Sequence, residues 1–250
     1  MSFQDHSTKS RMIITSPHNQ KLKQIRRLAR RRGRDAAGRF VAEGEDLLAA
    51  ADAAGWPAVD RFVAAGSGLE GLEVEPELLA HTSALGSGTR ALAVYEERWV
   101  APAGPLCVCL WGVGDPGNVG TVLRTAAAFG ASSVALGPDC ADPYGPKAVR
   151  ASMGAVFTMP LARVDSLSAL PGRTIALVAR GGQPLRGPVT DDVTLLVGAE
   201  RAGLPDEIVH SATQIAHIPI ATESLNAAIA ASVALYEITR PAGGLTTPAC

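Results

Sequence analysis

Between residues 106 and 240, short continuous apolar runs alternate with amphipathic stretches. Continuous runs of about four to eight apolar residues are typical of strands that are buried on both faces. The pattern predicts strands at 106–113, 132–136, 174–179, 193–197 and 214–218, and helices at 119–129, 146–152, 204–211 and 225–239. Strands that alternate with helices in this way predict an α/β fold with a parallel sheet.

The last predicted helix of this region has an apolar stripe at helical spacing. Leu225, Ile229, Val233 and Tyr236 fall on one side of it. We expect this side to be the buried one. The residues after it, 241–250, contain two prolines and two glycines and cannot continue a helix, so we expect a disordered tail.

The first 98 residues predict a second, smaller α/β domain. Its expected elements are a helix at 18–31 with Leu22, Ile25 and Leu28 or Ala29 on one side, an apolar stretch at 40–42, a helix at 43–54, and strands at 59–64, 72–74 and 91–95. Residues 99–105 carry two prolines and a glycine, which favour neither helix nor strand. We interpret the chain as domains at 1–98 and 106–240 that are joined by a linker.

Composition indicates a globular protein: 250 residues, 47% hydrophobic and 19% charged. No apolar run reaches the roughly 18 residues that a membrane span needs, and the first residues lack the apolar segment of a secretory signal. Cys107 and Cys109 alternate along one strand, so we expect both in the core, and no cysteine–histidine spacing predicts a zinc site. We therefore expect a cytoplasmic protein with no metal and no membrane partner.

The net charge of −1 hides a strongly basic segment. Eight of the 23 basic residues fall between 21 and 34 with no acidic residue among them: Lys21, Lys23, Arg26, Arg27, Arg30, Arg31, Arg32 and Arg34. The segment is either a solvated helix face or a surface that neutralises nucleic-acid phosphates. Like charges four residues apart oppose helix formation, so we favour an anionic partner. Lys147 and Arg150 share a face of a short helix and meet either phosphates or solvent.

The turn after the first strand of the larger domain contains a GxGxxG pattern at Gly112, Gly114 and Gly117. In a dinucleotide-binding fold the third glycine lies inside the helix, whereas Pro116 here predicts a helix that begins only after Gly117. A nicotinamide or flavin site is therefore disfavoured. Asn118 then stands at the helix start, either as an N-cap or as a site residue, and Arg124 lies about two turns further along.

Two later strands also end in residues that suit a ligand. Gly198 lets a ligand approach the backbone, and Glu200 either complements the next helix dipole or orients a positive partner. Ser224 is a candidate N-cap of the last helix. Asn226 offers amide donors and an acceptor that suit a sugar hydroxyl or an amino-acid group.

Taken in order, these segments resemble the three motifs of the SpoU/TrmH family, the RNA ribose 2′-O-methyltransferases of the SPOUT class. The motifs are Asn118-x-Gly120-x-x-x-Arg124, Leu196-x-Gly198-x-Glu200-x-x-Gly203-Leu204, and Ile218-Pro219 followed by Ser224-Leu225-Asn226-x-x-x-Ala230. The N-terminal residues Asn19, Lys21, Arg34, Phe40, Glu43 and Gly44 resemble the family's substrate-binding domain, which is similar to ribosomal protein L30e.

The resemblance implies a SPOUT-type parallel sheet with a C-terminal trefoil knot, an L30e-like N-terminal domain, and a homodimer. It implies S-adenosylmethionine as cofactor, held by Gly198, Gly203, Ile218, Leu225 and Asn226. The implied partner is a structured RNA, with 23S ribosomal RNA favoured over transfer RNA. The alternative is a non-catalytic RNA-binding assembly factor with the same fold.

By the same resemblance Arg124 is the central catalytic residue. A guanidinium holds its proton strongly, so we favour a clamp on phosphate and hydroxyl over a general base. Asn118, Glu200, Ser224 and Asn226 would complete the catalytic set. The expected RNA-binding residues are Lys21, Lys23, Arg26, Arg27, Arg30, Arg31, Arg34, Lys147 and Arg150.

Overall fold

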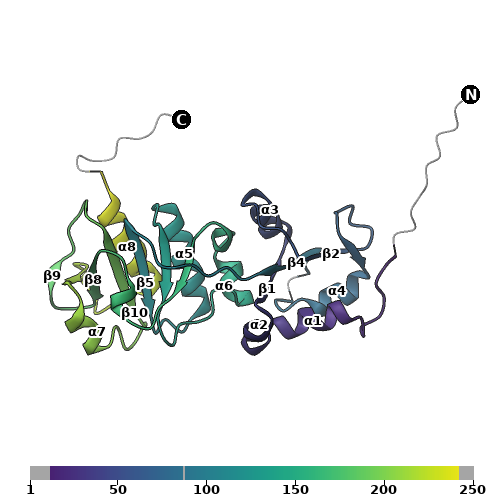
Figure 1. Cartoon of the computed structure of the whole chain (residues 1–250), viewed down its shortest axis with the longest axis horizontal. Coiled ribbons are helices and arrows are strands. Elements are labelled where there is room, and N and C mark those ends of the chain that lie inside the picture. The colour runs from purple at the N-terminus through teal and green to yellow at the C-terminus, as the bar shows by residue number, and fades with distance from the viewer. Residues whose placement is uncertain (1–11, 87, 242–250) are drawn as a thin grey trace, which may run out of the picture.

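The computed structural model of the chain describes residues 12–86 and 88–241. These residues form two sheets, a seven-stranded one and a four-stranded one, which lie at opposite ends of an elongated molecule (Figure 1). The expected disorder of the tail at 241–250 concerns residues that, apart from Pro241, lie outside the described part of the chain.

The larger sheet is parallel throughout its described pairings, as the apolar runs predict. Its strands are β5 (Leu106–Trp111), β6 (Ser133–Leu136), β7 (Leu161–Arg163), β8 (Arg173–Val178), β9 (Gln183–Pro184), β10 (Val193–Gly198) and β11 (Gln214–His217), in the order β7-β6-β5-β10-β8-β11-β9. The pattern missed β7 and β9, because three-residue and two-residue strands are too short to show one.

Helices cover both faces of this sheet. The helices are α5 (Pro116–Ala128), α6 (Pro146–Ala151), α7 (Asp206–Ser211) and α8 (Ala227–Thr239). Buried residues of α5 and α8 share one core with the sheet, and α7 packs on the opposite face, where Cys107 and Cys109 lie as expected. Burial raises the pKa of both thiols, which therefore behave as core residues.

Two helices begin elsewhere than the sequence predicts. The N-cap of α5 is Asp115, whose carboxylate accepts from the backbone NH of Asn118 at 2.8 Å, so Gly117 lies inside the helix and Asn118 is not the cap. The cap of α8 is Asn226 rather than Ser224. Its Oδ1 accepts from the NH groups of Ala228 at 3.0 Å and of Ile229 at 3.2 Å. Asp and Asn are strong caps because their side chains satisfy amides that the helix leaves free.

The buried face of α8 is also not the predicted one. Ile229, Val233 and Tyr236 are 53%, 39% and 45% exposed. The buried residues are four alanines together with Leu235 and Ile238. The helix is apolar on nearly every side, so the period of its hydrophobic residues could not choose a face.

The N-terminal sheet is mixed, with the order β1-β4-β2-β3. Its elements are α1 (Gln20–Leu28), α2 (Arg31–Ala37), β1 (Arg39–Glu43), α3 (Glu45–Ala53), β2 (Asp60–Ala64), β3 (Leu72–Val74), α4 (Pro76–Thr82) and β4 (Ala91–Glu96). Leu22, Ile25 and Leu28 of α1 are buried, as predicted. The single helix predicted at 18–31 is instead two helices, because the extended backbone of Arg30 separates α1 from α2. The helix α4 was not predicted.

The two sheets share one hydrophobic core across the predicted linker. The Phe40 ring of β1 lies 4.6 Å from that of Tyr144, and the Tyr95 ring of β4 lies 5.0 Å from that of Phe157. The Tyr144 hydroxyl donates to the carbonyl of Arg98 at 2.6 Å. Residues 99–105 therefore connect two packed bodies rather than two independent ones.

A buried ion pair lies in the same joint. Arg34 of α2 contacts Asp142 in the loop after β6, with Nε and Nη2 at 2.7 and 2.6 Å from one carboxylate oxygen. Its Nη1 donates to the carbonyl of Leu28 at 2.8 Å. Arg34 is only 4% exposed, so the expectation that it contacts RNA is wrong for this conformation: its charge is used inside the protein.

We expect Arg34→Met to lower the free energy of unfolding by about 3–5 kcal/mol, because it leaves the Asp142 carboxylate buried without a counter-ion. Urea unfolding measures this. The matched control is Arg39→Met, which breaks the more exposed pair with Glu96 and should cost about 1 kcal/mol or less. Adding Asp142→Asn to Arg34→Met should restore part of the loss; no recovery would contradict the electrostatic explanation.

Candidate active site at the carboxyl ends of three strands

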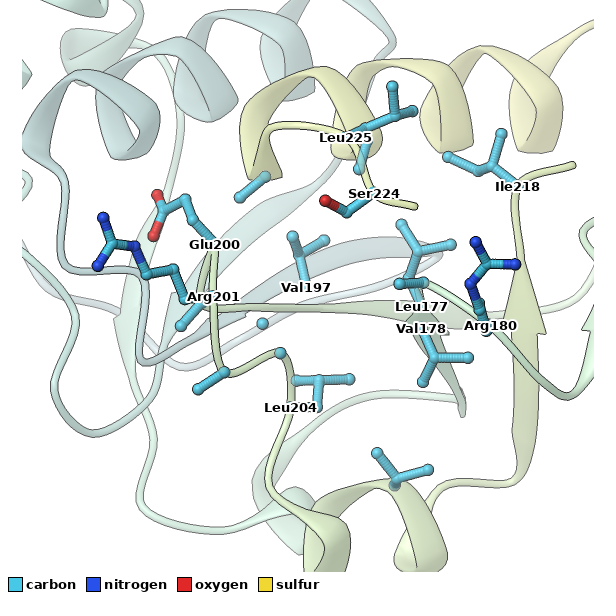
Figure 2. A pocket seen from close by; sticks show the side chains of 18 of the residues that line it. Leu177, Val178, Arg180, Val197, Glu200, Arg201, Leu204, Ile218, Ser224 and Leu225 are labelled. Atoms are coloured by element: carbon cyan, nitrogen blue, oxygen red, sulfur yellow. The ribbon is translucent and has the colours of Figure 1, made fainter. Parts of the chain in front are cut away.

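A cavity of about 490 Å³ opens at the carboxyl ends of β8, β10 and β11 (Figure 2). Three segments line it: residues 177–180 after β8, 197–204 after β10, and 218–225 before α8. In open α/β sheets, ligands bind outside the carboxyl ends of the strands. The volume lies in the range of small-molecule sites.

Apolar and polar groups line the cavity in about equal measure. Figure 2 shows Ser224 and Leu225 on one side of the cavity and Leu204 on the opposite side. Arg180 lies beside Ile218, at the end away from Glu200. Such a site suits a ligand with an apolar ring system and a few hydrogen-bonding groups.

The loop after β10 depends on glycine. A Cβ on Gly198 would overlap the backbone of Gly203 and Leu204. Ala199 and Gly203 exchange two backbone hydrogen bonds, at 3.1 and 2.9 Å, and Gly203 adopts a φ of +70°. Glycine at these two positions therefore lets the chain turn back tightly and present Glu200 beside the cavity.

A chain of hydrogen bonds joins three residues that are far apart in the sequence. The Asn118 side-chain amide donates to the Glu200 carboxylate. The Asn226 amide donates to the Asn118 carbonyl oxygen at 3.1 Å. Asn226 is fixed in turn by its capping bonds to α8. Residues at the starts of α5 and α8 and in the loop after β10 are thus joined by hydrogen bonds. This polar group lies next to the cavity, which Glu200 also lines.

Comparison with known proteins identifies this arrangement. Residues 105–236 match the model of the SpoU rRNA Methylase family, and residues 19–98 match that of the MRM3-like substrate binding domain. The chain belongs to the SpoU rRNA methylase family. The resemblance inferred from the three motifs is therefore confirmed, and the protein is an RNA methyltransferase.

Two relatives of this SpoU methylase cover most of its length, and a third covers half of it. A protein of Synechocystis sp. named as an uncharacterized tRNA/rRNA methyltransferase is 33% identical over 94% of this chain and 96% of its own. The AdoMet-bound rRNA methyltransferase from Sinorhizobium meliloti has a TM-score of 0.80 at 32% identity, over 90% of this chain and 96% of that one. A 23S rRNA uridine 2′-O-methyltransferase of Streptomyces viridochromogenes is 37% identical over 50% of this chain and 49% of its own.

The structure brings most predicted site residues of the SpoU domain together, but not Arg124. Gly198, Glu200, Gly203, Ile218, Ser224 and Leu225 line the cavity, and Asn118 and Asn226 are bonded to this group. Arg124 is exposed on α5, does not line the cavity, and forms no hydrogen bond or ion pair within the described ranges. Six residues after Asn118 on an α-helix, it lies about 9 Å further along and on a different side.

The predicted RNA-binding residues lie mostly on the surface. Lys21, Arg27, Arg30, Arg31, Lys147 and Arg150 are exposed, and Lys23 and Arg26 are half-buried. Lys21 pairs with Asp60, and Arg26 donates to the Pro17 carbonyl at 2.6 Å. Arg34 is buried and does not contribute to this surface. The other cations of α1 and α2 still form a strongly basic surface.

Sequence reasoning missed the wall formed by residues 177–180. The signal was present: Arg180-Gly181-Gly182 follows a predicted strand, as the other two cavity segments do. This segment was not predicted as part of the site because its residues belong to none of the three SpoU/TrmH motifs.

Residues 12–86 and 88–241 contain neither a metal-binding cluster nor a membrane-spanning helix. No cluster of three or more His, Cys, Asp and Glu side chains is placed to hold a metal ion there. No helix of this part of the chain is long and apolar enough to cross a membrane.

Proposed function

We propose that this SpoU methylase transfers a methyl group from S-adenosylmethionine to a ribose 2′-hydroxyl of structured RNA, with 23S ribosomal RNA as the favoured substrate. The observation that carries the proposal is the cavity at the ends of β8, β10 and β11 with the Glu200–Asn118–Asn226 chain beside it. The 23S rRNA 2′-O-methyltransferase among the relatives supports the favoured substrate, and such a substrate implies a cytoplasmic site of action.

The cavity fits the cofactor in size and chemistry. Leu177, Val197 and Leu204 provide apolar walls for an adenosyl group, and Gly198, Ile218 and Leu225 border the same space. We propose that these residues, with Gly203 and Asn226, hold the cofactor. When bound, S-adenosylmethionine supplies a methyl group on a sulfonium centre, which needs no metal for activation.

The residues around the cavity would act mainly by positioning. The Glu200–Asn118–Asn226 chain fixes both asparagine amides and the carboxylate in one arrangement before RNA arrives. Ser224, exposed at the cavity edge, is placed to contact the ribose or the cofactor. Arg124 would hold the target phosphate and stabilise the negative charge that develops on the 2′-oxygen, without giving up its own proton.

We propose that the active form is a homodimer built on α8. Ile229, Val233 and Tyr236 form an exposed apolar stripe on this helix, which is the usual mark of a covered interface. The adjacent helix α5 carries Arg124 and contacts α8 through Thr125 and Ser232, whose hydroxyls are 3.1 Å apart. An interface over α8 would therefore bring the unpaired Arg124 of one copy toward the site of the other.

The strand order also supports a trefoil knot. β8 and β9 follow each other in the chain, yet β11 pairs with both and lies between them. We propose that the C-terminal residues pass through the loop formed by the connection from β8 to β10, which generic chain topology seldom allows. The smaller N-terminal sheet with helices on both faces is likewise compatible with an L30e-like substrate-binding domain, bounded near residue 98.

We expect Arg124→Ala to lower methyl transfer by at least about 10³-fold, because it removes a charge that acts in the transition state. Transfer of labelled methyl from S-adenosylmethionine to ribosomal RNA measures turnover, with transfer RNA as the parallel substrate. Calorimetry should give a cofactor Kd within about twofold of wild type. Arg90→Ala, which changes an exposed arginine of the N-terminal sheet, serves as control. Near-normal turnover in Arg124→Ala would exclude the assigned role.

We expect Ile229→Glu to convert the dimer to a monomer in light scattering, because it places a charge in the apolar stripe. Leu72→Glu, an equally apolar but distant surface position, should leave the dimer intact. Mixing Arg124→Ala with Glu200→Gln chains then tests the trans arrangement: heterodimers regain activity only if Arg124 serves the partner's site. A monomeric wild type, or a mixture that stays inactive, counts against this arrangement.

We expect Arg27, Arg30 and Arg32, all exposed and unpaired among the described residues, to contact RNA phosphates. Replacing the three by Ala should reduce the slope of log K against log salt by roughly 2–3, since each lost phosphate contact contributes about 0.7–0.9. RNA binding is measured over a salt series. A slope equal to that of wild type would show that this surface does not meet the RNA backbone.

A further inference from the structure

A second recess of about 180 Å³ lies at the same sheet edge as the cofactor cavity, two to three strands away. Its walls come from the loops after β6 and β7, from the segment that joins the two sheets, and from α2. Parallel strands place their carboxyl ends on one edge, so the recess and the cavity open along a common border. The inference drawn from this recess rests on the proposed function, because it names a further contact with the same RNA.

The recess contains a cation–aromatic stack. The Arg163 guanidinium lies over the Trp99 ring, 3.9 Å from its centroid, and the Arg163 side chain is 56% exposed. The ring of Tyr144 meets Trp99 edge-on, at 5.2 Å. Trp99 is thus fixed from the side, and Arg163 presents its outer surface to the solvent.

One buried carboxylate holds both members of the stack. Glu97 accepts from the indole NH of Trp99 at 2.9 Å, and the same oxygen lies 3.8 Å from Arg163 Nη2. The Glu97 side chain is only 7% exposed. This arrangement pre-organises a guanidinium on an aromatic ring, so little side-chain freedom is left to lose when a ligand stacks on it.

The charges around the recess select the class of ligand. Asp139, Asp165, Arg31 and Arg163 all line the recess, and Asp142, which also lines it, pairs with Arg34. With carboxylates balancing the arginines, the recess has no surplus charge for a phosphate. Aspartates do accept hydrogen bonds from exocyclic amino groups of bases, and a guanidinium plane stacks on any base.

The backbone supports a shaped site at this place. Asp139 has a φ of +58°, in the left-handed region that residues other than glycine seldom adopt. Arg31, at the first residue of α2, donates to the carbonyl of Cys140 in the same loop at 3.4 Å. The recess is therefore bordered by the basic helix α2.

We propose that the Arg163–Trp99 stack is a platform for an unpaired nucleobase of the RNA substrate. The base stacks on the outer surface of Arg163, and Asp139 and Asp165 accept hydrogen bonds from its amino group. Its flanking phosphates run toward the basic surface of α1 and α2. The substrate is then recognised at three places along one edge: the basic helices, this platform, and the methyl-transfer cavity.

The test compares two labelled single-stranded RNAs of about 12 nucleotides, one with bases and one with an abasic backbone of equal charge, by fluorescence anisotropy on the full chain. We expect wild type to prefer the base-containing strand by about tenfold, since each stacked base contributes on that order. Arg163→Lys keeps the charge but loses the planar surface. It should reduce the preference to about twofold and leave affinity for the abasic strand unchanged.

The matched control is Arg90→Lys, an exposed arginine paired with Glu45 on the N-terminal sheet, which should keep the full preference. Glu97→Gln, which weakens the support of the stack, should lower the preference in the same direction as Arg163→Lys. Equal weakening of both strands by Arg163→Lys would indicate a phosphate contact only and overturn the proposal, as would an unchanged preference. Cofactor affinity, measured in parallel, should not change; a wild type that fails to bind S-adenosylmethionine refutes the proposed function and not the platform.

Discussion

The pairing of β11 with β8, rather than with its chain neighbour β10, determines where the active site can lie. Because β8 then stands between β10 and β11, three consecutive strands of the sheet end side by side and send residues 177–180, 197–204 and 218–225 to a common border. The apolar strands and the alanine-rich α8 make this pairing stable, since both faces of the sheet are covered. If β11 paired elsewhere, the cavity would lose the wall that carries Ser224 and Leu225, and Asn226 could not reach Asn118.

A second constraint fixes the small sheet to the large one. The rings of Phe40, Tyr95, Tyr144 and Phe157 form one buried cluster, and the Arg34–Asp142 pair closes it beside α2. Breaking such a joint would expose the aromatic cluster and leave buried charges unpaired, so independent motion of the two halves is costly. The basic helices α1 and α2 are therefore held at a set position relative to the cavity. If α1 and α2 contact the RNA as proposed, this fixed spacing would itself contribute to recognition, because only RNA that spans both places correctly could bind.

The sequence predicted the parts of the molecule that depend on local pattern and missed those that depend on tertiary partners. Five strands of the large sheet lie within a few residues of their predicted bounds, because continuous apolar runs between turns have few alternative structures. The motifs also led to Asn118, Glu200 and Asn226, which the structure links. In contrast, the burial of Arg34 could not be predicted, because its partner Asp142 lies more than a hundred residues away in the sequence. The pairing of Trp99 with Arg163 could not be predicted either, because Trp99 lies in the predicted linker and Arg163 ends a three-residue strand.

Two features of the single chain are unexplained by its own contacts, and the proposed homodimer would account for both. An apolar stripe of Ile229, Val233 and Tyr236 is exposed on α8, although most other apolar residues of this helix are buried. The adjacent helix α5 carries Arg124, which has no hydrogen-bond or ion-pair partner among the described residues. A solvated arginine costs nothing, but a contiguous apolar surface is disfavoured in water. A second copy that covers α8 would remove this cost and, by the same contact, would bring the Arg124 guanidinium toward the other copy's chain of two amides and a carboxylate. On this argument dimer formation and catalytic competence would be one event: burial of the apolar stripe would provide the free energy, and Arg124 would stabilise the transition state in the resulting geometry.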